Sequence, residues 1–134
     1  MTADDLTAAL RACAVGIYPL EAGVALLISN GAFVRRPDFT SRFITTGTSI
    51  SDGTTLMAAV DWDAAIAALQ AGELPCSGGE RRVLQLSASL AGGIPVDLRD
   101  AVTSLDDSNV ARLVTAILHG SGNGRRTAGI DDHL

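Results

Sequence analysis

The sequence contains no lysine, so all ten of its basic residues are arginines. With abundant alanine and glycine, this composition is typical of a GC-rich bacterial genome. Fifteen acidic residues leave a net charge of −5. Proteins that bind nucleic acid through its phosphates need an excess of positive charge, at least on one face. The charge balance therefore disfavours a general nucleic-acid-binding function.

Aromatic residues and long apolar runs are also scarce. Only 4% of residues are aromatic although 47% are hydrophobic, so Ala, Leu, Val and Ile must build the core. The longest dense apolar run, Val24–Ile28, is far too short to cross a membrane. The first residues do not resemble a signal peptide, so we expect a cytoplasmic protein with no membrane association. Such a composition often leaves an apolar face exposed, which favours association with itself, as a homodimer, or with another protein.

The two cysteines, Cys13 and Cys76, are too few for a disulfide framework and form no C-x-x-C pair. Cys76 precedes a predicted helix, whose N-terminal dipole can lower a thiol pKa, and His119 could approach it in space. Packing or connector roles remain the preferred interpretation of both cysteines. We therefore expect no catalytic residue, cofactor or metal, and an enzyme of unknown class is our third functional hypothesis.

Helix-start residues followed by apolar residues three or four apart occur along most of the chain. Thr2 with Asp5, and Ser77 with Glu80, have the spacing of capping boxes. Glycines follow most of the apolar stretches and end the helices. These patterns predict about six helices, at residues 2–16, 19–30, 61–72, 77–92, 98–102 and 104–120, with a further helical turn or two at 37–43.

A β-hairpin is predicted near residues 44–60. The two flanks are rich in β-branched residues, and Asp52-Gly53 between them favours the positive φ of a turn. An isolated hairpin is only marginally stable, so it must pack on the helices.

These elements predict a mainly α-helical (α+β) fold in a single compact domain over residues 1–120. Residues 1–72 would hold a helix pair, the hairpin and a further helix, and residues 77–120 a tri-helical unit. Residues 121–134 are predicted to be a flexible tail, because small and polar residues dominate there.

Part of the tri-helical unit, within residues 80–120, resembles the winged-helix and helix-turn-helix regulators. Leu105–Val114 resembles their recognition helix, and Val96–Val102 resembles the helix before it. The resemblance implies contacts to DNA bases and phosphates from Ser108, Asn109, Arg112, Arg125 and Arg126.

The chain departs from that pattern where DNA would approach. Ser104 stands where these regulators usually have glycine, and Asp106 and Asp107 would face phosphates, which proteins neutralise with positive charge. We therefore expect a small non-enzymatic interaction or accessory module that self-associates, and keep a winged-helix-like DNA-binding regulator as the alternative.

Three further arginines, Arg35, Arg36 and Arg42, surround Pro37. They are candidates for contacts with a phosphate or an acidic partner. The competing interpretation is a solvated face on which these arginines pair with acids such as Asp38.

Overall fold

The computed structural model describes residues 1–122. In this part of the chain, seven helices and one two-stranded antiparallel hairpin confirm the predicted mainly helical α+β fold. The elements are α1 (Ala3–Ala14), α2 (Tyr18–Asn30), α3 (Pro37–Phe43), β1 (Ile44–Thr48), β2 (Leu56–Val60), α4 (Trp62–Gln70), α5 (Gly78–Gly92), α6 (Leu98–Thr103) and α7 (Asp107–Gly120).

The helix ends follow from local sequence. Thr2 and Ser77 each accept a hydrogen bond from the backbone three residues later and form the predicted capping boxes. Gly31 and Gly93 end α2 and α5 in the left-handed conformation that glycine adopts without strain. Pro37 provides the first residue of α3, which forms a helix of its own rather than an isolated turn.

The hairpin pairs Ile44 with Val60 and Thr48 with Leu56, and β2 packs against α1. The loop between the strands is held by Asp52, whose Oδ1 accepts from the backbone N–H groups of Thr54 and Thr55, both at 2.9 Å. The hairpin therefore rests on a helix, as its marginal intrinsic stability requires.

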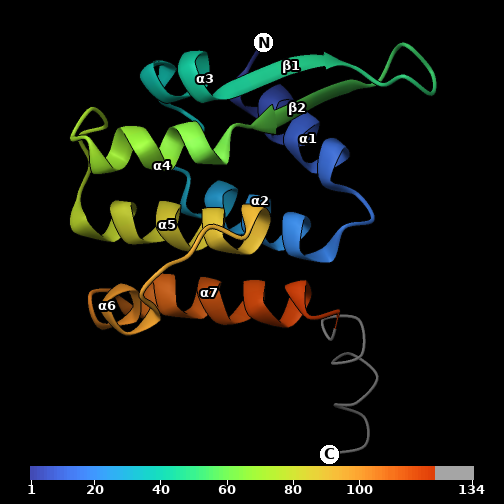
Figure 1. Cartoon of the computed structure of the whole chain (residues 1–134). Helices are drawn as coiled ribbons and strands as arrows, with labels where there is room; N and C mark the ends of the chain where they lie inside the picture. The colour runs from blue at the N-terminus through green and yellow to red at the C-terminus, as the bar shows by residue number, and fades with distance from the viewer. Residues whose placement is uncertain (123–134) are drawn as a thin grey trace, which may run out of the picture.

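The helices are arranged around α2, which packs most extensively against α5 and α7. Figure 1 shows the hairpin and α1 at one end of the molecule and α6 and α7 at the other, with α2, α4 and α5 between them. The predicted helices of the tri-helical unit are all present, but α7 packs chiefly on α2 rather than on α5.

The larger of two hydrophobic clusters, here called the hairpin-side core, joins α1–α5 and the hairpin. It contains every aromatic side chain of the chain except Tyr18. The rings of Phe33 and Phe39 are 5.1 Å apart, and those of Phe39 and Phe43 are 5.2 Å apart. Such ring pairs bury large areas and stabilise beyond that burial.

The smaller cluster, here called the α7-side core, lies between α2, α5, α6 and α7. It has no aromatic member, and its buried residues are Ala22, Leu26, Val83, Leu86, Ala101, Leu113 and Ala116. Small side chains let the helices come close together. A Cβ at Gly23 of α2 would lie only 2.6 Å from the Ala91 Cβ and the Ser87 carbonyl of α5.

Candidate functional site

Helix α7 is positioned by its own cap and by one buried face. The side chain of Asp106 accepts from the backbone N–H of Asn109 at 2.8 Å and starts the helix. Leu113 and Ala116 then turn towards α2 and are 6% and 4% exposed. Gly120 closes the contact, since a Cβ there would be 3.1 Å from the Ala22 Cβ of α2.

A second apolar face of α7 is not covered by the described part of the chain. Val110, Val114, Ile117 and Leu118 recur at the spacing of one helix face, and they are 40%, 50%, 48% and 41% exposed. We call these four residues the outer stripe. At 1.5 Å per residue it runs about 12 Å along the helix.

Helix α6 adds two exposed apolar side chains near the start of α7. Leu98 is 55% exposed and Val102 is 38% exposed, while Ala101 between them is buried. The spacing of the apolar residues along α7 does not by itself separate two faces. The structure divides these residues into a packed face around Leu113 and the outer stripe, because α2 and α5 cover only one side of the helix.

The residues predicted to contact DNA do not share one surface. Ser108 is exposed, whereas Asn109 is 6% exposed and faces the interior. The Asn109 Oδ1 accepts from Asn30 Nδ2 at 3.3 Å and from Arg112 Nη1 at 3.0 Å. Arg125 and Arg126 lie outside the described residues. Asn109 could therefore reach a base only after losing its link to α2.

The remaining polar face of α7 lines a cavity rather than a free outer surface. Arg112, Thr115 and His119 line a space of about 520 Å³ together with residues of α1 and α2. At one end of it, His119 Nε2 lies 2.6 Å from Glu21 Oε1. Sequence reasoning did not single out Arg11 or Glu21, because only the packed helices bring them beside α7.

Two of the three arginines around Pro37 are paired with acids. Arg36 Nη2 lies 2.6 Å from Asp38 Oδ2, and Arg42 Nη2 lies 3.0 Å from Glu73 Oε1. The hydrogen bond to Asp38 raises the pKa of Arg36 and lowers that of Asp38. Arg35 is exposed and has no ion-pair partner among the described residues. The pairings favour a solvated face over an anion site.

The environment of Cys76 does not activate its thiol. Burial raises the pKa of Cys76, and the nearby Glu80 carboxylate raises it further, although Arg36 and Arg81 act in the opposite direction. A thiol with a raised pKa is less ionised at neutral pH and therefore a poorer nucleophile. Within residues 1–122, no cluster of three or more His, Cys, Asp or Glu side chains could hold a metal ion.

Comparisons with known proteins add no family to this description, since no family profile, curated protein or solved structure matches the chain. Among the described residues, no helix combines the length and hydropathy needed to span a lipid bilayer.

Proposed function

We propose that the protein is a non-enzymatic interaction module that associates with a second copy of itself through the outer stripe of α7. One observation carries the proposal. Val110, Val114, Ile117 and Leu118 form a continuous helical stripe and are each at least 40% exposed. Scattered exposed apolar residues are ordinary on a protein surface, but a contiguous apolar patch indicates an interaction site.

A second copy suits this stripe because the stripe is complementary to itself. The one charged residue between Val110 and Leu118 is Arg112, and it lies on the face of α7 that lines the cavity. Two stripes related by a two-fold axis therefore place apolar side chains on apolar side chains. In an antiparallel pair the opposed helix dipoles also attract. Acidic Asp106 and Asp107 at the start of one α7 would then lie near the end of the other, which Arg125 and Arg126 follow in the sequence.

The DNA-binding alternative has less support from the same helix. Val110, Val114 and Ile117 offer a DNA groove no hydrogen bonds, and Asn109 is already bonded to Asn30. The two functions respond to salt in opposite ways. Contacts to DNA phosphates weaken steeply with salt. Association of two chains that each carry a charge of −5 is instead favoured when salt screens their repulsion.

The proposal is tested by sedimentation equilibrium over a range of protein and salt concentrations. The apparent mass should rise with concentration towards twice the 13.8 kDa of the chain, and added salt should not lower it. Val114→Glu should weaken association at least about tenfold, because it buries a charge in the interface.

Ile50→Glu is the matched control. Ile50 is also apolar and fully exposed, but it lies in the hairpin loop. Its replacement should leave the dissociation constant unchanged. A chain that stays monomeric at every concentration, or that loses association equally in both variants, would refute self-association through the stripe.

A further inference from the structure

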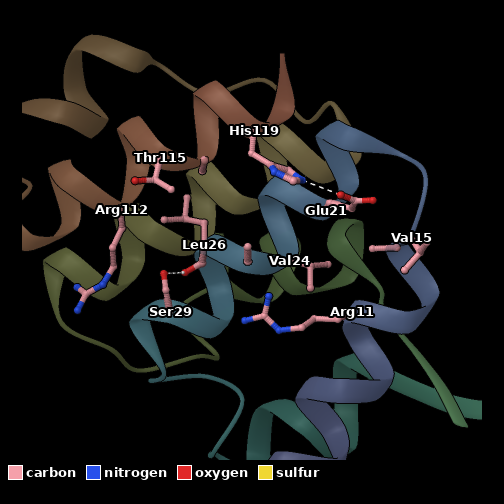
Figure 2. A pocket seen from close by; sticks show the side chains of 12 residues that line it. Arg11, Val15, Glu21, Val24, Leu26, Ser29, Arg112, Thr115 and His119 are labelled. Atoms are coloured by element: carbon pink, nitrogen blue, oxygen red, sulfur yellow. Dashed lines mark hydrogen bonds and ion pairs between the residues drawn. The ribbon is translucent and has the colours of Figure 1, made fainter. Parts of the chain in front are cut away.

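The cavity beside the polar face of α7 lies between three helices. Figure 2 shows α2 at its floor, with the last turn of α1 on one side and α7 on the other. Val24, Ala25 and Leu26 contribute apolar surface to the floor, and Ser29 lies near its end. Its volume of about 520 Å³ is within the usual range for small-molecule sites, which are mostly apolar with a few placed polar groups.

Two arginines line this cavity without a carboxylate partner in the described part of the chain. Arg11 is exposed on α1 and makes no hydrogen bond or ion pair there. Arg112 donates one N–H to the Asn109 amide, which leaves its other donors available. In Figure 2 the two guanidinium groups lie on either side of Ser29. This differs from Arg36, Arg42 and Arg82, which each pair with an acid.

The acidic residue lining the cavity lies at the opposite end. Glu21 Oε2 accepts from the Gly16 backbone N–H at 2.7 Å, and its Oε1 lies 2.6 Å from His119 Nε2. In Figure 2 this pair and the Arg112 guanidinium lie on opposite sides of the Arg11 guanidinium. Neither Arg11 nor Arg112 forms an ion pair with the Glu21 carboxylate, which contacts Gly16 and His119 instead.

We propose that this cavity binds a small organic acid, whose carboxylate lies between Arg11 and Arg112 and whose apolar body covers the α2 floor. Guanidinium groups bind carboxylates through paired, charge-assisted hydrogen bonds. Val24, Ala25 and Leu26 exclude water from the apolar part of the bound acid. The site is separate from the outer stripe, which lies on another face of α7.

The test compares octanoate with octan-1-ol, its uncharged counterpart of equal chain length, in titrations of the full chain followed by NMR. Octanoate should bind more tightly than octan-1-ol. Arg11→Gln with Arg112→Gln should weaken octanoate at least about tenfold, since each charge-assisted bond contributes more than a neutral one, and should leave octan-1-ol unchanged. Arg11→Gln alone should also weaken octanoate binding, and it leaves the hydrogen bond between Arg112 and Asn109 in place.

Three controls locate the binding. Arg99→Gln removes an exposed arginine of α6 and should have no effect. Ala25→Leu fills the floor and should weaken both compounds. Val114→Glu alters the outer stripe and should leave octanoate binding intact.

Several results would overturn the proposal. These are no octanoate binding at millimolar concentration, equal affinity for the acid and the alcohol, or binding that survives loss of both arginines. Loss of octanoate binding in Val114→Glu would place it on the outer stripe and would equally refute the cavity site.

Discussion

The hairpin-side core and the α7-side core are built from side chains of different size. The first contains three phenylalanines and a tryptophan and is enclosed by α1–α5 and the hairpin. The second is built from alanine, leucine and valine between α2, α5, α6 and α7. At the hairpin end the large side chains point inwards. At the α7 end, the four side chains of the outer stripe remain exposed, as do Leu98 and Val102 of α6.

The difference shows how an aromatic-poor chain divides its apolar material. Small residues such as Gly23, Ala22 and Ala116 let helices approach closely, but the described part of the chain covers only the Leu113 side of α7. Helix α7 is apolar over a wider arc than α2 and α5 can cover. The excess becomes the outer stripe, for which we propose a second copy as the partner.

The largest expected effect is on the hairpin-side core. Phe39→Ala removes a fully buried ring that lies against Phe33 and Phe43, and should lower the free energy of unfolding by roughly 3–5 kcal/mol. Leu113→Ala in the α7-side core should cost only about 2 kcal/mol, because a smaller side chain is removed from a smaller cluster. Urea denaturation measures both. Equal losses would contradict the contrast between the two cores.

A smaller loss is expected where α2 crosses α5. Gly23→Ala places a Cβ 2.6 Å from the Ala91 Cβ and should destabilise by roughly 1–3 kcal/mol through overpacking. Gly78→Ala is the matched helical control, since a Cβ there meets nothing within 4 Å. It should be neutral or slightly stabilising, because alanine favours helix. Equal unfolding temperatures for the two variants would show that α2 and α5 are not closely packed at Gly23.

Loss of the hydrogen bond between α2 and α7 should lower the free energy of unfolding by a smaller amount again. Asn109→Ala removes the acceptor shared by Asn30 and Arg112 and should cost about 1 kcal/mol. Ser108→Ala, one residue earlier and exposed, should stay within about 0.5 kcal/mol of the unmodified chain. If the two variants are equally stable, Asn109 does not hold α7 in place.

The smallest effect is expected at the hairpin loop. Hydrogen bonds from the Thr55 hydroxyl and from the Thr55 and Thr54 backbone lower the pKa of Asp52 to about 2. The ionised form is thus favoured in the folded loop. Its stabilising effect is complete above the ordinary pKa of aspartate and is lost as the pH falls towards 2. An NMR titration should find this low pKa, and Thr55→Val should raise it. A midpoint near the ordinary value would contradict the loop geometry.

Most of the fold could be predicted from sequence because its signals are local. Capping boxes at Thr2 and Ser77, prolines at helix starts and glycines at helix ends act within a few residues. The Asp52-Gly53 turn is equally local. These features do not depend on which helix packs against which.

The outer stripe and the cavity could not be predicted from the sequence, because they depend on how the helices pack against one another. Val110 and Leu113 are alike in an apolar pattern, and only the position of α2 decides that one is exposed and the other buried. Asn109 could likewise be a base-reading residue or a buried link. Arg11 and Arg112 are about a hundred residues apart in the sequence and line one cavity only after α1, α2 and α7 have packed.

The most direct test of the central claim is methyl NMR of the intact chain recorded over a dilution series. The account predicts that the methyl signals of Val110, Val114, Ile117 and Leu118 shift together with protein concentration, while those of Ile50 and Val15, which are also exposed, do not. Stripe signals that stay fixed at every concentration, or shifts centred on the hairpin, would contradict it.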